Sequence, residues 1–166
     1  MKLYIQTDPK WSNVSMAIEG DLLGRWGCLI TSLSNIFSFA LNTDKLNPKD
    51  LNDIVKQYEA YQWYVDKKLD TASNLCWERF KKIYDNSFSI QNNLSAKDML
   101  NVKSIYYIAR LSYKVIDPKS SYGYMHYVNV LDVRGDSVII FDTYKGGVHI
   151  INVSNISWVH QIQHKE

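Results

Sequence analysis

The sequence contains two thiols, Cys28 and Cys76, in very different surroundings. Cys28 follows Gly-Arg-Trp-Gly and opens a segment whose apolar spacing predicts a helix. Unpaired N–H groups and the positive end of the dipole at a helix N-terminus stabilise a thiolate, and Gly27 would leave room there for a substrate. Cys28 is therefore a candidate nucleophile. Cys76 lies within an amphipathic pattern, and we expect it to be a small buried hydrophobic residue.

A cysteine nucleophile needs a histidine within hydrogen-bond reach and a group that orients the histidine. His126 begins a segment with the alternation of a strand, and Asp142 ends the next such segment. The other histidines are weaker candidates, because His164 lies near the end of the chain and His149 and His160 have no evident carboxylate partner. We therefore expect His126 to act with the cysteine and Asp142 to orient its ring.

The relative position of His126 and Asp142 depends on the turn between their two segments. A three-residue loop at 134–136 would place Asp142 opposite Val128, which shares a face with His126, so the two side chains would be diagonal neighbours. A two-residue loop would put them on opposite faces of the sheet. The arrangement therefore predicts an odd-numbered loop, with Gly135 in a bulged turn.

Apolar spacing predicts helices in the first half of the chain and strands in the second. One helix runs from Cys28 to about Asn42, a second is capped by Asn47 and continues to Tyr58, and a third begins near Asp70. A short helical turn is capped at Ser95. The expected strands are 105–113, 126–133, 137–142, 148–153 and 156–162. This order predicts an α+β fold, with an N-terminal helical half packed on a C-terminal antiparallel β-sheet.

Length and composition indicate an ordinary globular domain. The chain has 166 residues and no linker-like stretch, so we expect residues 1–166 to form a single domain. A hydrophobic share of 46% and a charged share of 22% exclude a disordered or disulfide-rich class. Two thiols make neither a zinc knuckle nor a disulfide framework, and we expect no metal and no cofactor.

Charge and hydropathy limit the partners. The 19 basic and 17 acidic residues give a net charge of +2 and are scattered, so we expect no nucleic-acid partner. No apolar run approaches the roughly 20 residues that cross a bilayer, so we expect no membrane insertion. The first residues lack the apolar core of a signal peptide, which predicts synthesis in the cytoplasm. The final site stays open between the cytoplasm and, for a phage protein, the virion or release from the cell.

Four segments carry a resemblance to a known family: Gln6–Trp11, Gly24–Leu33, His126–Val130 and Phe141–Asp142. Together they resemble the double-glycine (bacteriocin) leader peptidase-like branch of the papain-like cysteine peptidases, particularly the stand-alone members of bacteria and their phages. The resemblance extends from Gln6 to Asp142, and the segment from about Thr43 to Asn101 has no match in it. It implies a papain-like cysteine peptidase fold for the domain.

The resemblance also implies roles for the matching residues. Cys28 would be the nucleophile and His126 the general base and later the acid. Asp142 would orient the imidazole of His126. Gln6, upstream of the cysteine, would donate a hydrogen bond to the oxyanion. Trp11 also matches the family pattern, but we expect it to be a packing residue.

These features predict a cysteine peptidase or amidase that cleaves a peptide or isopeptide bond through an acyl-enzyme. Its partner would be a peptide or protein substrate, and we prefer cell-wall peptide or a host protein to a leader peptide. Two alternatives stay open. One is an acyltransferase that uses the same triad, and the other is a catalytically silent papain-like binding module or virion component. The oligomeric state is also left open.

Overall fold

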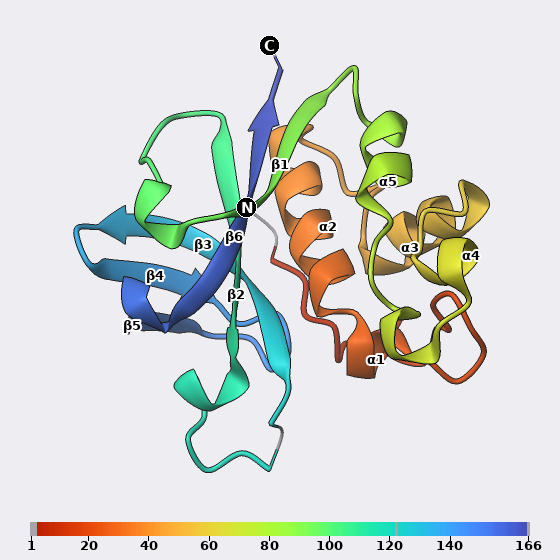
Figure 1. The fold of residues 1–166 in the computed structure, drawn as a ribbon, viewed down its shortest axis with the longest axis horizontal. Coiled ribbons are helices and arrows are strands. Elements are labelled where there is room, and N and C mark those ends of the chain that lie inside the picture. Colours follow the sequence, from red (N-terminus) through yellow and green to blue (C-terminus); the bar gives the residue numbers. More distant parts are fainter. Residues whose placement is uncertain (1–2, 122, 166) are drawn as a thin grey trace.

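The computed structural model describes residues 3–121 and 123–165. A small helical part lies beside a six-stranded antiparallel sheet, with α2 between the sheet and the other helices (Figure 1). The helical elements are α1 (Leu23–Trp26), α2 (Cys28–Ala40), α3 (Pro48–Gln57), α4 (Trp63–Asp66), α5 (Trp77–Ile83) and the 3-10 turns η1 (Leu69–Thr71), η2 (Ala96–Asp98), η3 (Tyr113–Val115) and η4 (Val153–Asn155). The strands are β1 (Phe88–Leu94), β2 (Ile105–Ser112), β3 (Met125–Arg134), β4 (Ser137–Phe141), β5 (Val148–Asn152) and β6 (Ile156–His164). The expected α+β architecture is thus confirmed.

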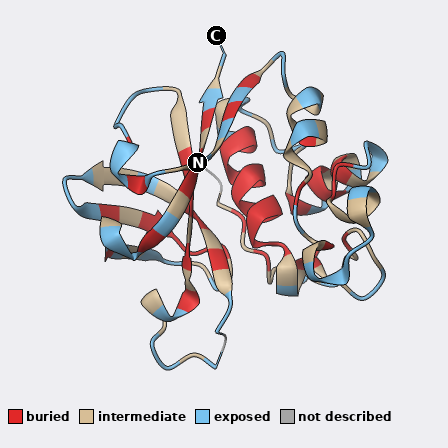
Figure 2. Ribbon diagram, in the orientation of Figure 1, coloured by how far each residue is buried: buried red, intermediate tan, exposed pale blue. Residues whose placement is uncertain are grey.

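The helix expected at Cys28 is present as α2, and it is buried along most of its length (Figure 2). It packs against β3 and β2 on one side and against α3 on the other, which explains its broad apolar pattern. It ends at Ala40, slightly earlier than expected, and Asn42 beyond it has a left-handed backbone with a φ of 47°. Among the helices formed by the described residues, none is long and apolar enough to cross a membrane.

Two expected caps are also present. The side chain of Asn47 accepts hydrogen bonds from the main-chain N–H groups of Lys49 and Asp50 at the start of α3. The hydroxyl of Ser95 accepts one from the N–H of Lys97 at the start of η2. Each cap satisfies donors that have no partner inside the helix.

The predicted start of the third helix was wrong. Around Asp70 there is only the short turn η1, and the helix α5 begins later, at Trp77. Residues 72–74 form a turn, and Leu75 and Cys76 then pair with a distant segment, where the N–H of Cys76 donates to the carbonyl of Ala60 at 2.9 Å. Cys76 is consequently the residue that precedes α5, and it is half-buried rather than buried as expected.

The strands of the sheet lie in the order β1-β6-β2-β3-β4-β5. Strands β2 to β6 match the expected strands to within two residues at each end, so these predictions are confirmed. Strand β1 was not expected, although its buried Phe88 and Ile90 alternate with more exposed polar residues. It extends the sheet beside β6, and the ring of Phe88 stacks on Phe37 of α2 with centroids 4.4 Å apart.

The hairpin between β3 and β4 differs from the expected one. Arg134 pairs with Ser137, so the turn has two residues rather than three, and Gly135 in it has a φ of +58°. A bulge at Leu131 then adds one residue to β3. Beyond the bulge, the pairing is the one that a three-residue loop would have produced. The predicted loop length was therefore wrong, but the register near the start of β3 was right.

Four residues form a buried amide chain, which joins α2 to the sheet: Tyr4, Asn35, Asn129 and Ser32. Asn35 of α2 accepts from the N–H of Tyr4 at 2.6 Å and donates to the side-chain oxygen of Asn129 at 2.7 Å. Asn129 of β3 donates in turn to the carbonyl of Ser32 at 2.9 Å. Both asparagines are almost fully buried. The amide chain therefore sets how α2 lies on β3.

We predict that Asn129→Ala lowers the free energy of unfolding by about 1–3 kcal/mol, because it leaves buried partners of the amide chain without their hydrogen bonds. Asn101→Ala is the matched control, since Asn101 donates to Asp132 at the surface, and its effect should stay below about 0.5 kcal/mol. Urea unfolding of the two variants measures the difference. Equal stability of the two variants would contradict a structural role for the amide chain.

Candidate active site

Cys28 is the first residue of α2, at the junction with α1. Its main-chain N–H has no partner inside α2, because the first N–H groups of a helix are unpaired there. A Cβ at Gly27 would lie 2.5 Å from the carbonyl oxygen of Leu23. Glycine is thus required for the close approach of α1 to α2, and the space expected for a substrate is filled by Leu23.

The thiol of Cys28 and the imidazole of His126 are electrostatically coupled. Burial alone would raise the pKa of Cys28, but the interaction with His126 and the N–H groups of Tyr127 and Leu29 outweigh it, and the pKa of the thiol is lowered. Burial alone would lower the pKa of His126, but its interactions with Asp142 and with the thiol raise it to about 9. Both shifts favour a thiolate beside an imidazolium.

The two ring nitrogens of His126 face different partners. Nε2 lies 2.9 Å from Oδ1 of Asp142, and since an ionised carboxylate only accepts, Nε2 carries a proton. Nδ1 is left for Cys28. No other described residue hydrogen-bonds to Nδ1, and the interaction of the ring with the thiol shifts the pKa of both groups.

The carboxylate of Asp142 is held by several donors. Its Oδ1 also accepts the N–H of Tyr144 at 2.8 Å, and its Oδ2 accepts the N–H of Lys145 at 3.2 Å. Burial alone would raise its pKa, but the hydrogen bond with His126 and these main-chain donors lower it. Asp142 therefore stays ionised at neutral pH, although only 1% of its surface is exposed.

Tyr113 is part of the site and was missed by the sequence reasoning. Its hydroxyl donates to Oδ2 of Asp142 at 3.4 Å, and its ring meets that of His126 edge-on with centroids 5.2 Å apart. The ring of Tyr144 packs on the same tyrosine, with its centroid 5.6 Å from that of Tyr113. Tyr113 follows β2 rather than the predicted hairpin, so only the pairing of β2 with β3 reveals its position.

Gln6 is fully buried, and it contacts both the segment before Cys28 and the residue after Asp142. Its side-chain Nε2 donates to the carbonyl of Gly24 at 3.2 Å, one turn before Cys28. Its main-chain N–H donates to the carbonyl of Thr143 at 2.7 Å, next to Asp142. The structure thus brings Gln6 to the segment that precedes the cysteine, together with the other three predicted site residues.

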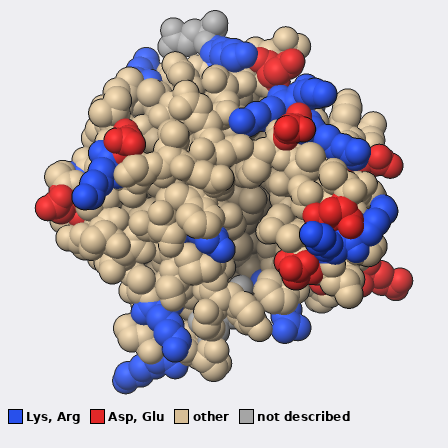
Figure 3. Space-filling model, in the orientation of Figure 1, with Lys and Arg blue, Asp and Glu red and all other residues tan. Residues whose placement is uncertain are grey.

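A cleft of about 400 Å³ opens beside Cys28. Trp26 and Tyr124 contribute an aromatic pair to its lining, with ring centroids 5.5 Å apart. Arg110 and Trp158 line it from the sheet. In Figure 3 this face of the molecule is hollowed between the helical part and the sheet. The thiol therefore has a substrate-sized space in front of it.

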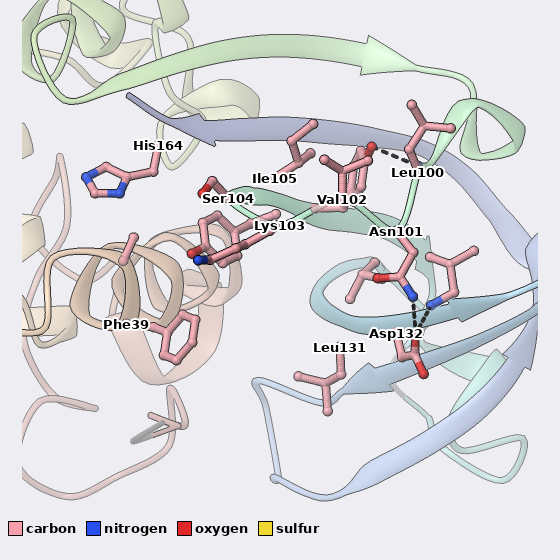
Figure 4. Close-up of a pocket in the computed structure, with 15 residues that line it drawn as sticks. Phe39, Leu100, Asn101, Val102, Lys103, Ser104, Ile105, Leu131, Asp132 and His164 are labelled. Atoms are coloured by element: carbon pink, nitrogen blue, oxygen red, sulfur yellow. Dashed lines mark hydrogen bonds between the residues drawn. The ribbon is translucent and has the colours of Figure 1, made fainter. Parts of the chain in front are cut away.

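A larger groove of about 590 Å³ lies elsewhere and has different chemistry. Figure 4 shows Phe39 and Leu131 on its walls, and Cys28 does not line it. Its one carboxylate, Asp132, accepts from Asn101 at 2.9 Å (Figure 4). Cys28 lines the smaller cleft instead.

His160 is buried without serving as a base. It lies between the rings of Trp77 and Tyr127, with centroids 4.6 and 5.6 Å away. Burial, with the nearby charges of Arg110 and Lys81, lowers its pKa to about 4. His160 is therefore uncharged at neutral pH, and His126 is the histidine coupled to the thiol.

No protein-family model and no curated protein matches the chain. Within 3–121 and 123–165, no group of three or more His, Cys, Asp or Glu side chains could hold a metal ion. The functional assignment therefore rests on the geometry of the site.

We predict that iodoacetamide at about pH 6 alkylates Cys28 at least tenfold faster than Cys76. An ordinary thiol with a pKa of about 8.5 is almost wholly protonated at that pH, whereas a lowered pKa keeps Cys28 partly as the reactive thiolate. Peptide mapping by mass spectrometry gives both rates in one sample. Equal rates, or a rate at Cys28 that vanishes below pH 8, would contradict the coupling with His126.

We also predict that Asp142→Asn slows alkylation of Cys28 at pH 6, because loss of the carboxylate destabilises the His126 imidazolium and so raises the pKa of the thiol. Asp142→Ala should slow it further, since asparagine still orients the ring. Asp136→Asn, in the exposed turn, is the control and should have no effect. An essential Asp136 with a dispensable Asp142 would contradict the assignment, and urea unfolding of each variant separates loss of fold from loss of coupling.

Proposed function

We propose that this protein is a cysteine peptidase or amidase on a papain-like fold, which cleaves a peptide or isopeptide bond. The observation that carries the proposal is the coupled set of Cys28 at a helix N-terminus, His126, and Asp142 at 2.9 Å from the ring. A buried ion pair of this kind is a costly arrangement for stability alone. It is what nucleophilic catalysis by a thiol requires.

In the acylation step, the Cys28 thiolate attacks the carbonyl carbon of the scissile bond, and a C–S bond forms while the carbonyl electron pair moves to oxygen. Nδ1 of the His126 imidazolium then gives its proton to the leaving nitrogen as the C–N bond breaks. The product is a thioester and a free amine. Asp142 keeps Nε2 protonated and so keeps Nδ1 directed at the reaction.

In the deacylation step, Nδ1 of the neutral imidazole takes a proton from water as the water oxygen attacks the thioester carbon. The C–S bond then breaks, the carboxylic acid leaves, and the thiolate and imidazolium are restored. An amine in place of water would give acyl transfer instead. Both outcomes share the acyl-enzyme.

The negative oxygen of each intermediate needs donors that are already in place. The N–H of Cys28 at the start of α2 is one such donor. Gln6 is the proposed second donor, because its side-chain amide is buried against Gly24 and has one N–H left beyond that hydrogen bond.

The test is cleavage of a combinatorial peptide library and of cell-wall cross-bridge peptides, followed by mass spectrometry in water labelled with ¹⁸O. We expect cleavage with one labelled oxygen in the new acid, and a loss of about a thousandfold or more in Cys28→Ala and His126→Ala. Cys76→Ala is the matched control and should keep full activity.

Cleavage that persists in Cys28→Ala would refute the proposal. Products that carry an added amine instead of the labelled oxygen would favour the acyltransferase. Selective binding of a peptide without turnover would favour the silent binding module.

A further inference from the structure

Arg110 occupies the sheet side of the cleft that contains Cys28. It lies on β2, where it pairs with Tyr127 of β3 on one side and with Trp158 of β6 on the other. Its guanidinium stacks on the ring of Trp158, with the central carbon 4.1 Å from the ring centroid. The residue is half-buried. Main-chain pairing and stacking therefore hold this positive charge in a fixed place.

Arg110 has no carboxylate partner among the described residues. No Asp or Glu oxygen there lies within 4.0 Å of its guanidinium, whereas Arg134 and Arg79 do form ion pairs with Asp132 and Glu59. A partly desolvated guanidinium without a counter-ion is unfavourable for folding. An anion supplied from outside the chain would remove that cost.

The cleft is also electrically polarised. Asp70 lines it from the helical side, and it does not pair with Arg110. Figure 3 shows a basic group on the sheet side of the central hollow and both acidic and basic groups on its helical side, where Asp70 is the charged residue that lines the cleft. A bound segment therefore meets a positive charge on the sheet wall and a negative charge on the opposite one.

Stacking on Trp158 does not by itself explain why the charge of Arg110 lies in the cleft. Arg25 makes a similar contact, 5.0 Å above the ring of Trp26, but it is exposed and does not line the cleft. A surface arginine of that kind needs no further partner. Arg110 differs because its charge lies inside the cavity that holds the reactive thiol.

We propose that Arg110 binds a carboxylate of the substrate and makes the cleft selective for an acidic segment next to the scissile bond. This inference rests on the proposed function, since it names the substrate class of the same site. A planar guanidinium matches a carboxylate in a two-point hydrogen bond. The carboxylate could belong to an Asp or Glu side chain or to a chain terminus, and the experiment below separates the two.

The test uses small alkylating probes of Cys28 that differ only in charge. Chloroacetyl-glutamate amide, chloroacetyl-glutamine amide and chloroacetyl-lysine amide compare side chains, and chloroacetyl-glycine compares a free terminal carboxylate with its amide. Each rate at Cys28 is divided by the rate with iodoacetamide for the same variant, so that general changes in reactivity cancel. Intact-mass spectrometry follows the reaction.

In the unmodified protein we expect the glutamate probe to react about tenfold faster than the glutamine probe, and the lysine probe to be slowest. Arg110→Gln should remove this preference, Arg110→Glu should reverse it toward lysine, and Arg110→Lys should retain most of it. Arg25→Gln is the matched control and should keep the original preference. Preference for free over amidated chloroacetyl-glycine would assign the site to a terminal carboxylate.

Equal rates with the glutamate and glutamine probes and with the two glycine probes would overturn the inference, and so would a preference that survives in Arg110→Gln. Neither result affects the proposed function, because Cys28 would still react. The proposed function fails separately, when cleavage of the peptide library persists in Cys28→Ala.

Discussion

The buried amide chain determines how the helix that carries the thiol lies on the strand that carries the imidazole. Cys28 and Asn35 lie about two turns apart on α2, and His126 and Asn129 lie close together on β3. Apolar contacts are non-directional, so they allow a helix to shift along a sheet at little cost. The hydrogen bonds between Asn35, Asn129 and Tyr4 are satisfied in one register alone. Polar groups within the core therefore set the distance between sulfur and imidazole.

Buried hydrogen bonds also fix the position of the Asp142 carboxylate. The turn after β4 folds around Asp142, and Thr143 anchors this turn twice: its hydroxyl donates to the carbonyl of Tyr127, and its own carbonyl accepts from Gln6. Thiolate, imidazolium and carboxylate then alternate in sign, and each stabilises the next. Removal of one charge would leave the others buried without compensation. The three groups consequently behave as one unit, with Gln6 as part of its support.

Periodicity and residue type were enough to predict α2, the α+β order and strands β2 to β6, because these depend on local patterns. They were not enough for the hairpin, because the register of β3 on β4 depends on both the turn and any bulge. A two-residue turn with a bulge at Leu131 gives the same register near the start of β3 as a three-residue turn without a bulge. The start of α5 failed for a similar reason, as Cys76 pairs with the distant Ala60. Arg110 and Tyr113 carry no local signal, because their proximity to the site arises from strand pairing.

That pairing also explains why the cleft has walls of unequal stiffness. Arg110 lies between Tyr127 and Trp158 in the register of three adjacent strands, so all three residues stand at one level of the sheet and line one wall. Trp26 comes from the short helix α1, and Tyr124 lies just before β3, outside the strands. Ladders between three strands restrain the first wall, whereas Trp26 and Tyr124 make their main-chain hydrogen bonds outside the sheet, with Leu22 and Tyr113. A charge on the rigid wall keeps a constant distance to the sulfur, and that constancy is what selection between substrates by charge requires.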